Sequence, residues 1–432
     1  MSCACYGRLA LQLAGRKARR VVQLLGGGVG RRIAAASRCG GLESSGRHPP
    51  GGPYDVLCLP IIEWDYRFQR PQQLMRQFAR HGHRVFYMSH QFLLWTQVVA
   101  RPLEANLTEL RLRGNVGQDA YHAAVSRGDA GSMADALARL PLGRGRDETV
   151  VIVQLPFWTR LAEDLRDRFG WRIVYDCMDD LSGFSRRGNA MIAEEPRLLE
   201  IADVTIASSE PLRQKILTHS PRVALVRNGV DYEHFAAVQQ QLPLSPRGQS
   251  HFRRTKIGTV PFDAVIGYYG AIARWFDSSL VAELAALRPR WRLRLVGDTY
   301  SADLSRLRKL PNLELLGERR YAELPGLIAD WDCCIIPFKR TPLTEATNPV
   351  KVYEMLASGK PVVAVDLPEL RPLAAAGLIQ TAGDAAGFAA KIAGSLADDS
   401  DAKRDQRRAF ARQNTWIDRF HAMAAAIADC RG

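Results

Sequence analysis

The segment at residues 348–365, NPVKVYEMLASGKPVVAV, constrains the fold of this chain more than any other. A short apolar run precedes it at 333–338, and a second ends it at 361–365; both have the composition of buried parallel strands. Between them, Asn348 is placed to cap a helix, Pro349 suits the first helical position and Gly359 suits a left-handed exit. The pattern therefore predicts strand, long loop, helix and strand. In open α/β sheets, ligands bind beyond the carboxyl ends of the strands, against helix N-termini.

Two charged side chains follow the start of this predicted helix. Lys351 and Glu354 are three residues apart, so they share one helical face. In the functional interpretation, Lys351 lies near phosphate oxygens at the positive end of the helix dipole, and Glu354 accepts two hydroxyls, as from a ribose diol. In the structural alternative, the two form a surface ion pair that stabilises the helix by about 0.2–0.5 kcal/mol. The residues alone leave both interpretations open.

The segment resembles the nucleotide-sugar site of GT-B glycosyltransferases, specifically the family-4-like group of polysaccharide and teichuronic-acid-type biosynthesis. The resemblance implies that Glu354 holds the ribose of a nucleotide-diphospho-sugar. Many members carry another glutamate eight residues earlier, which touches the donor sugar; here that position is Ala346, with Glu345 beside it. Variants of the form N-x-P-x-K-x-x-E exist in the group, and this chain is more similar to them. The implied fold class is α/β, GT-B: two Rossmann-like doubly wound parallel-sheet domains facing a central cleft.

Composition is compatible with that fold. The chain has 432 residues, enough for two α/β domains. No uncharged apolar run approaches the ~20 residues that a membrane helix needs. The eight cysteines form no CxxC pair, which favours free thiols in a reducing cytoplasm over disulfides.

Basic charge is concentrated at the amino end. The formal net charge is +14, of which residues 1–52 supply +8 and the rest only +6. Three interpretations of this tail stay open: a disordered extension or mis-assigned start, a segment attracted to anionic lipid, and a targeting peptide. Nucleic-acid binding is not favoured, because the tail offers no supporting motif.

The predicted elements give four parts: a basic, disordered tail at 1–52; an N-terminal Rossmann-like acceptor domain at 53–240; a C-terminal Rossmann-like nucleotide-sugar domain at 256–405; and a C-terminal helix at 406–432. In the resembled fold that last helix crosses back to the first domain; a plain surface helix is the alternative. Strands are expected at 55–62, 84–88, 149–154, 172–175, 204–207, 223–226, 264–269, 292–296, 313–316, 333–337 and 361–365. The span 105–146 is expected to form helices and loops peripheral to the sheet, 239–255 an interdomain linker and 398–405 a charged, solvated connector.

The chain lacks the motifs of two other classes of nucleotide-binding protein. A dinucleotide fold needs G-x-G-x-x-G after the first strand, where this chain reads PIIEWDYRFQRPQ. A P-loop GxxxxGK[ST] is also absent. The pair Asp399 and Asp401 reads as DxD but follows no strand end, so no metal site is expected there.

Further donor-side residues follow from the resemblance. The strand at 264–269 ends at Gly270, and Arg274 follows where the family places a basic residue on the diphosphate; a solvated loop arginine is the alternative. The loop at 317–321, which ends at Tyr321, is expected to wall the nucleobase. Together with Asn348, Pro349, Lys351 and Glu354, these residues make up the expected donor site.

The loop after the first strand is expected to face the acceptor. It resembles a W-D-x-x-x-x-R-P-Q signature of polysaccharide-building glycosyltransferases. Its alternative role is architectural, with Pro71 starting a helix and Trp64 packing on it. The candidates there are Glu63 and Asp65 as catalytic groups and Trp64, Arg67 and Arg70 as acceptor contacts.

The sequence YDCMDD at 175–180 supplies a second acidic candidate. Asp176, Asp179 and Asp180 are expected either to meet an acceptor hydroxyl or to orient a basic residue. Asp176 is assigned to the acceptor side, and Asp179 is favoured as the base that reaches the attacking hydroxyl. Metal binding is the alternative for such a cluster. GT-B enzymes usually need no metal, because a helix dipole and basic residues stabilise the leaving diphosphate.

The sequence therefore predicts a cytoplasmic glycosyltransferase, peripheral to the inner face of the plasma membrane through residues 1–52 if the tail binds lipid. It would move a sugar from a nucleotide-diphospho-sugar to a lipid-linked cell-envelope or exopolysaccharide acceptor, without a metal or other cofactor. The resemblance implies retention of anomeric configuration. A non-catalytic sugar-nucleotide-binding scaffold and a GT-B sugar-nucleotide epimerase are the alternatives.

Overall fold

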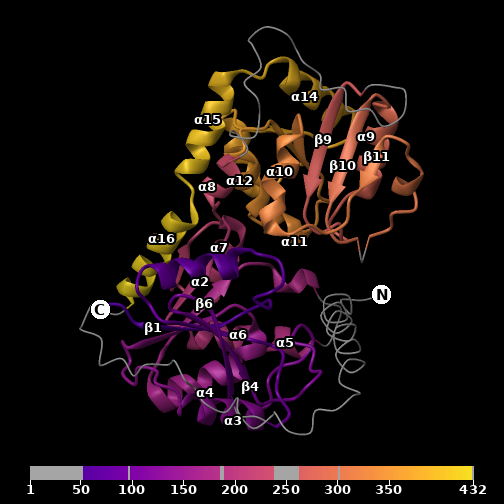
Figure 1. Cartoon of the computed structure of the whole chain (residues 1–432). Helices are drawn as coiled ribbons and strands as arrows, with labels where there is room; N and C mark the ends of the chain where they lie inside the picture. Colours follow the sequence, from indigo (N-terminus) through magenta and orange to yellow (C-terminus); the bar gives the residue numbers. More distant parts are fainter. Residues whose placement is uncertain (1–51, 96–97, 185–188, 238–261, 300–301, 431–432) are drawn as a thin grey trace, which may run out of the picture. The chain divides into compact units, whose positions relative to one another are not determined.

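The computed structural model describes residues 52–95, 98–184, 189–237, 262–299 and 302–430 (Figure 1). Its contacts divide the chain into two compact units. Unit 1 takes in Met1–Ala207, Lys215–Ala224 and Met423–Gly432, and unit 2 takes in Ser208–Gln214 and Leu225–Ala422. Except for residue 52, the basic tail lies outside the described residues, as does the expected linker at 239–255.

Unit 1 is built on an eight-stranded sheet with the order β3-β4-β2-β1-β5-β6-β7-β8. The pair β3–β4 is antiparallel; the pairs β4–β2, β2–β1, β1–β5, β5–β6 and β6–β7 are parallel. Its strands are β1 (Asp55–Leu59), β2 (Val85–Met88), β3 (Val98–Glu104), β4 (Leu107–Leu112), β5 (Thr149–Val153), β6 (Arg172–Cys177), β7 (Val204–Ala207) and β8 (Val223–Leu225). Strands β1, β2, β5, β6 and β7 are buried along their whole length, as parallel strands covered on both faces must be.

The helices of this part of the chain connect successive strands. They are α2 (Arg70–Arg80), α3 (Arg127–Leu137), α4 (Thr159–Phe169), α5 (Ala190–Ala193), α6 (Glu195–Ile201) and α7 (Glu210–Leu217), with short 3-10 turns at Pro156–Trp158 and Leu181–Phe184. Helix α2 has Pro71 in its first turn, where a missing N–H costs nothing, and Gly82 follows its end at φ +89°.

One prediction for unit 1 is wrong. The span 105–146 was expected to lie outside the sheet, but β4 within it pairs with β2 on one side and with β3 on the other. The strand is hard to recognise from the sequence because β4 contains charged residues. Glu109 is one of them, but it is 1% exposed and lies inside the protein. Arg101 and Arg111 both form ion pairs with that carboxylate, at 3.0 and 3.1 Å, which makes its burial tolerable.

Unit 2 has a six-stranded, wholly parallel sheet with the order β11-β10-β9-β12-β13-β14. Figure 1 shows β9, β10 and β11 side by side in orange tones. The strands are β9 (Ala264–Tyr269), β10 (Trp291–Val296), β11 (Leu313–Leu315), β12 (Cys333–Ile336), β13 (Val362–Ala364) and β14 (Gln380–Thr381). The predicted strand at 264–269 is confirmed residue for residue.

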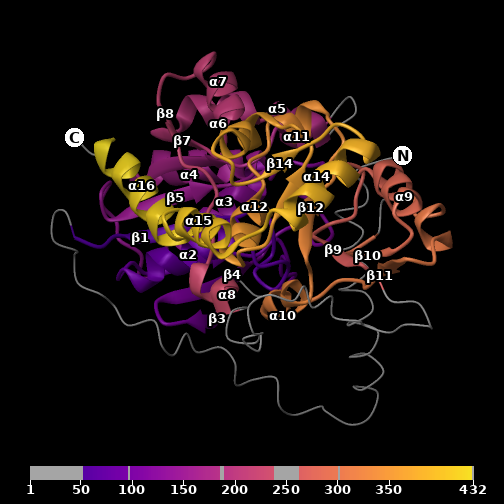
Figure 2. The same cartoon turned by 90° about the horizontal axis from the view of Figure 1, so that it is seen from above.

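The remaining helices are α8 (Tyr232–Ala236), α9 (Ser278–Leu287), α10 (Leu324–Ala329), α11 (Pro342–Glu345), α12 (Val350–Ala357), α13 (Arg371–Ala375), α14 (Ala385–Ala397), α15 (Asp401–Arg412) and α16 (Trp416–Asp429), with 3-10 turns at Leu307–Lys309, Tyr321–Glu323 and Pro368–Leu370. Helix α12 packs along α15 (Figure 1, Figure 2). The first domain expected at 53–240 includes residues 228–235, but Val230 and Phe235 are fully buried in the core of unit 2.

The carboxyl-terminal region also differs from expectation. Asp401 begins α15, so the stretch 398–405 is only partly a connector, and the expected boundary at 405 falls inside this helix. The Ser400 side chain accepts the Lys403 N–H and supplies the cap. The C-terminal helix expected at 406–432 is instead the end of α15 followed by α16, which Figure 1 draws in yellow.

Candidate functional site

In unit 2, a glycine follows the carboxyl end of β9 and another follows the carboxyl end of β10. Gly270 follows β9 at φ +128° and Gly297 follows β10 at φ +152°, both in the region that favours glycine. A Cβ atom on Gly297 would lie 1.8 Å from the carbonyl oxygen of Gly270, so no side chain fits there. The Gly270 N–H donates to Val296, and the Gly297 N–H donates to Gly317, each at 2.9 Å. The strand ends are thereby held close together without side chains between them.

Helix α12 starts at the same edge of the sheet, because it follows the loop after β12. Its cap is Pro349, with φ −71° and ψ 113°, and not Asn348 as the sequence predicts. Proline supplies no side-chain acceptor, so the first turn carries no side-chain cap. The predicted exit is confirmed, since Gly359 adopts φ +78°.

Asn348 is instead a buried link within unit 2. Its amide group donates to a carboxylate oxygen of Glu369 at 2.7 Å and to the Tyr353 hydroxyl at 3.1 Å. Its side-chain oxygen accepts the backbone N–H of Asn228 at 3.0 Å. Glu369, which the sequence analysis missed, also accepts from the guanidinium of Arg227 at 2.8 Å. These bonds fix the loop that leads into α12.

Glu354 lies in the middle of α12 and is 5% exposed. The hydroxyl of Tyr269, the last residue of β9, donates to its carboxyl group at 2.5 Å. Burial raises the pKa of Glu354 to about 7, although the bond from Tyr269 and the charge of Lys351 oppose that rise. A carboxylate in this setting gains strongly from any further hydroxyl that donates to it.

Lys351 reaches across to the turn after β9. A Cβ atom on Gly270 would lie 3.4 Å from the Lys351 ammonium nitrogen, which places that cation beside the strand end. The ammonium also lies 4.8 Å from the centre of the Phe338 ring and 5.8 Å from that of Tyr268. Aromatic faces hold a cation in position without neutralising it. The alternative of a surface ion pair does not describe Glu354, which is buried and accepts a hydrogen bond from Tyr269, although the charge of Lys351 acts to lower its pKa.

Arg274 projects from the loop after β9, and its side chain is exposed. The loop itself is firmly held: the Ile272 N–H donates to Asp298 at 2.9 Å, and the Asp277 N–H donates to Pro337 at 2.8 Å. The Lys339 N–H donates back to Trp275 at 2.7 Å. A fixed loop therefore carries a long, exposed cation at the strand-end edge where Lys351 lies.

Tyr321 is part of an aromatic group that leads toward Glu354. Its ring stacks on His234 with 4.4 Å between centroids, and His234 Nε2 lies 3.0 Å from the Tyr321 carbonyl oxygen. Phe235 contacts Tyr321 at 5.6 Å and Tyr269 at 6.4 Å between centroids. His234, in the stretch NGVDYEHF at 228–235, was not among the residues that the sequence singled out.

Glu345, the acidic residue next to the expected sugar position, has another partner. Glu345 pairs with Arg340 at 3.0 Å on the surface. Ala346 is buried, and its carbonyl oxygen accepts the Ser209 hydroxyl at 2.5 Å. No carboxylate therefore replaces the glutamate that the family usually carries at position 346.

In unit 1, the loop after β1 is organised by hydrogen bonds. Gln72, which the sequence analysis did not single out, donates its amide to the carbonyl oxygens of Arg67 at 2.9 Å, Glu63 at 3.2 Å and Trp64 at 3.3 Å. It also accepts the N–H of Gln69 at 3.1 Å. The final glutamine of the W-D-x-x-x-x-R-P-Q signature is thus the residue that shapes the loop.

Arg70 and Asp176 form a buried ion pair with 2.8 Å between Nη2 and Oδ1, and they are 2% and 0% exposed. Gln154 donates to the same carboxylate at 3.1 Å. Their predicted contact with an acceptor is not supported by this geometry, since both groups face each other inside the unit. They join the loop after β1 to the end of β6.

Glu63 and Asp65 also have partners. Glu63 accepts the Ser89 hydroxyl at 2.7 Å and the His90 N–H at 2.6 Å. Burial alone would raise the pKa of Glu63, but the bonds from His90 and Ser89 outweigh it and lower the pKa. Asp65 is exposed and pairs with Arg101 at 2.8 Å. The lowered pKa makes Glu63 poorly suited to accept a proton near neutral pH.

The two remaining loop candidates make aromatic contacts. Trp64 meets Tyr87 edge-on, with 5.2 Å between centroids, and the Arg67 guanidinium lies 5.0 Å from the centre of the Tyr66 ring. Trp64 thus packs on β2, whereas the alternative expected it to pack on the helix that Pro71 starts. Neither contact tests a role in acceptor binding, which stays a prediction.

Asp179 differs from the other acidic candidates. It follows β6, is half-buried, and its carboxyl group has no hydrogen bond or ion pair with any described residue. Burial, with a smaller contribution from Asp180, raises its pKa to about 6. Asp180 itself is bound by Lys215 and Ser182, both at 2.6 Å. Asp179 is thus the carboxylate of this edge with a proton affinity suited to a general base.

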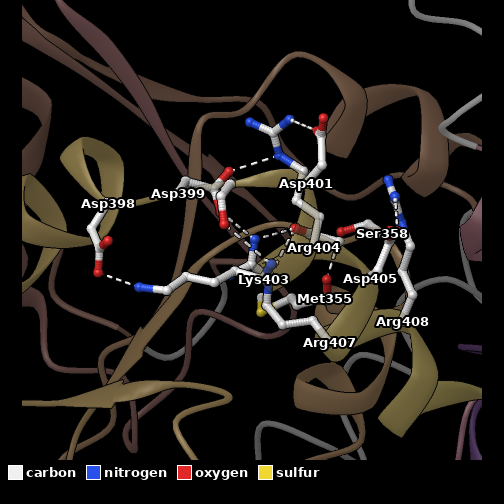
Figure 3. A network of polar contacts seen from close by, with 12 residues as sticks. Met355, Ser358, Asp398, Asp399, Asp401, Lys403, Arg404, Asp405, Arg407 and Arg408 are labelled. Atoms are coloured by element: carbon white, nitrogen blue, oxygen red, sulfur yellow. Dashed lines mark hydrogen bonds and ion pairs between the residues drawn. The ribbon is translucent and has the colours of Figure 1, made fainter.

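Within the described ranges, no three or more His, Cys, Asp and Glu side chains gather as metal ligands would. The Asp399 and Asp401 pair is bound by arginines, as Figure 3 shows: Arg404 contacts both, at 2.8 and 3.0 Å. All five described cysteines are free thiols. Among the described helices, none has the length and apolarity to cross a bilayer.

Comparison with known proteins agrees with this architecture. The sucrose-phosphate synthase of Thermosynechococcus elongatus superposes with a TM-score of 0.60 at 17% identity, over 88% of this chain and 98% of that one. Anabaena HepE, solved in complex with UDP and glucose, superposes with a TM-score of 0.57 at 15% identity, over 86% of this chain and 99% of that one. The predicted fold class is confirmed: the chain has the GT-B fold, with two Rossmann-like parallel-sheet units.

The sequence of unit 2 is similar to that of a known family. Residues 264–398 match the family model described as Glycosyl transferases group 1. A Bacillus subtilis protein named as the teichuronic acid biosynthesis glycosyltransferase TuaH is 32% identical over 221 residues, which are 47% of this chain and 53% of that protein. The chain thus spans about half the length of this curated relative. The resemblance that the sequence indicates is confirmed as a similarity: unit 2 matches the group 1 glycosyltransferase model, and the chain has the GT-B fold.

Proposed function

We propose that this protein transfers a sugar from a nucleotide-diphospho-sugar to a hydroxyl group of a cell-envelope or exopolysaccharide acceptor, one carried on a lipid. The observation that carries the proposal is the placement of Glu354 and Lys351 on α12, beside the Gly270 turn at the end of β9. One helix there offers a buried carboxyl group and a positioned ammonium at a strand-end edge, which suits a ligand with a diol at one end and phosphates at the other.

In this proposal Glu354 accepts hydrogen bonds from the two ribose hydroxyls. Lys351, Arg274 and the first turn of α12 neutralise the diphosphate, and the wall near Tyr321 and His234 contacts the base. The bond between the anomeric carbon and the diphosphate oxygen breaks, and its electron pair leaves with the nucleoside diphosphate. These cations stabilise the negative charge that develops on the leaving group.

The acceptor hydroxyl oxygen forms the new bond to the anomeric carbon and loses its proton. Asp179 is the proposed base, because its carboxyl group is half-buried, unpaired among the described residues and has a pKa of about 6. Such a group is largely ionised at neutral pH yet still basic enough to take a proton. Retention of configuration is part of the proposal through the resemblance alone.

Glu354→Gln tests the donor site. The change removes a charged acceptor, and a hydrogen bond to a charged group contributes about 1.5–3 kcal/mol, so donor affinity is expected to fall at least tenfold. Calorimetry with UDP-glucose comes first, since the HepE complexes hold UDP and glucose or UDP-glucose, followed by GDP-, ADP- and dTDP-sugars. The surface variant Glu345→Gln is the matched control. Equal donor affinity in folded Glu354→Gln protein would refute the site.

A donor-only assay separates the alternatives. An epimerase converts the donor sugar without an acceptor, a transferase at most hydrolyses it slowly, and a scaffold leaves it unchanged. The scaffold alternative retains one observation in its favour: position 346 is a buried alanine where family members carry a glutamate. Conversion of the donor alone would overturn the transferase proposal.

A further inference from the structure

Exposed apolar side chains gather in one short stretch of unit 1. Trp95 is 90% exposed, Leu94 57% and Val99 42%. Scattered exposed apolar residues are common, but a tryptophan with almost its whole ring in solvent beside an exposed leucine is not, and such patches mark interaction sites. We call Leu94, Trp95, Val99 and Arg113 the apolar tip.

Backbone bonds bring these residues together. After β2 the chain continues alongside β4, where the Leu93 N–H donates to Leu112 at 2.9 Å and the Gly114 N–H donates to Leu93 at 3.2 Å. Leu93 and Arg113 are bridge partners, so Leu94 and Trp95 leave the sheet next to Arg113. Val99 of β3 lies opposite Arg111 of β4 in the antiparallel register. The tip is therefore one local surface.

Its charge is positive. Arg113 is exposed, and its guanidinium has no hydrogen bond or ion pair with another described residue. Arg111 and Arg101 share the buried carboxylate of Glu109, and Arg101 also pairs with the exposed Asp65, so two carboxylates face three arginines here. An exposed tryptophan and leucine flanked by arginine is the composition that enters the interfacial layer of a bilayer, with the ring at the headgroup level and the cation on lipid phosphates.

We propose that unit 1 docks on an anionic lipid bilayer through the apolar tip. Strands β2 and β4 run parallel to β6, so the tip follows the same carboxyl edge of the sheet as Asp179. Strands β2 and β6 are three positions apart in the sheet, which corresponds to roughly 14 Å. A bilayer at the tip would hold a lipid-linked acceptor near the acceptor-side carboxylate. The docking itself does not depend on the proposed function.

The test is co-sedimentation of the full chain with phosphatidylcholine vesicles that contain or lack phosphatidylglycerol. The double variant Leu94→Ser, Trp95→Ser is expected to bind the anionic vesicles at least tenfold more weakly, because two large apolar groups no longer enter the bilayer. Arg113→Gln is expected to lower binding about fivefold on anionic vesicles only. The matched control is Leu287→Ser, which changes a leucine that is 54% exposed at the end of α9 in unit 2.

Trp95→Phe supplies a second measurement that a folding defect cannot imitate. This variant keeps the apolar tip but removes one of the eight tryptophans. The fluorescence of the unchanged chain is expected to shift to the blue on addition of anionic vesicles, and the shift is expected to be lost in Trp95→Phe while sedimentation persists. Equal sedimentation of the double variant and the unchanged chain would overturn the proposal. A concentration-dependent dimer that the double variant abolishes, without vesicle binding, would also overturn it and assign the tip to a second copy.

Discussion

The carboxyl group of Glu354 is buried, so its ionisation costs free energy. Burial raises its pKa to about 7 from an ordinary value near 4.5. The folded protein thus keeps the proton that the unfolded chain loses. The contribution of Glu354 to the free energy of unfolding is therefore complete below about pH 4.5. It is lost as the pH rises through about 7, and the total is on the order of 3 kcal/mol. Donor binding should follow the opposite trend, because ribose hydroxyls donate to the ionised form.

We therefore expect donor affinity to increase several-fold between about pH 6 and pH 8. Tyr269→Phe should move the midpoint of that increase upward, since it removes the hydroxyl that stabilises the carboxylate at 2.5 Å. Tyr268→Phe is the matched control: its hydroxyl donates to the Ala271 carbonyl at 2.9 Å and not to Glu354. Calorimetry across this pH range measures the effect. A midpoint that stays the same in Tyr269→Phe would show that Glu354 does not control donor affinity.

At the scale of elements, α15 holds the end of α12. Arg407, 6% exposed, donates two N–H groups to the Gly359 carbonyl oxygen at 2.9 and 2.7 Å, and pairs with Asp399 at 2.5 Å (Figure 3). A cation there satisfies a helix-end carbonyl and complements the negative end of the helix dipole. The position of Glu354 and Lys351 thus depends in part on a helix some 50 residues later in the sequence.

Arg407→Ala should lower the free energy of unfolding by about 1.5–3 kcal/mol, because it leaves a buried carbonyl and a nearly buried Asp399 without this partner. The melting temperature of the transition that contains unit 2 should fall by roughly 5 °C. Arg404→Ala is the control: that arginine is 44% exposed, and its ion pairs should contribute less than about 1 kcal/mol. Calorimetric scans that show equal losses for the two variants would contradict a special role for Arg407.

Local patterns predicted α12 and its flanking strands correctly, since β-branched runs, the placement of Lys351 and Glu354 and the exit at Gly359 all lie within one short segment. The role of Asn348 was out of reach, because its partner Asn228 is 120 residues away in the sequence. Strand β4 was missed for a similar reason: the arginine of β3 that makes a buried Glu109 tolerable becomes a neighbour only when the hairpin forms. Sequence patterns thus give the elements, whereas long-range polar pairs decide which side chains remain available at a site.

For the whole molecule, we expect turnover without a divalent ion. The cations of Lys351 and Arg274, with the first turn of α12, are placed to offset the charge of a leaving diphosphate. Activity in excess EDTA should equal activity in buffer, and Mg²⁺ or Mn²⁺ should not raise it more than about twofold. Lys351→Ala is the companion variant, and its activity should fall in both media. Full loss of turnover in EDTA that Mg²⁺ or Mn²⁺ restores would refute this expectation.

The basic tail is expected to contribute to association with anionic membranes. Residues 1–52 carry a net charge of +8, and each basic group near an anionic surface contributes about 1 kcal/mol, so deleting them should lower association with anionic vesicles while leaving donor binding unchanged. Screening acts over about 8–10 Å at physiological ionic strength, so the contribution of the tail should fade as salt rises. The contribution of Trp95 and Leu94 is apolar and should persist. Co-sedimentation of the full and truncated chains at two salt concentrations, each with and without the Leu94→Ser, Trp95→Ser change, measures the two contributions separately. If the full and truncated chains sediment equally at low salt, the tail has no part in membrane association.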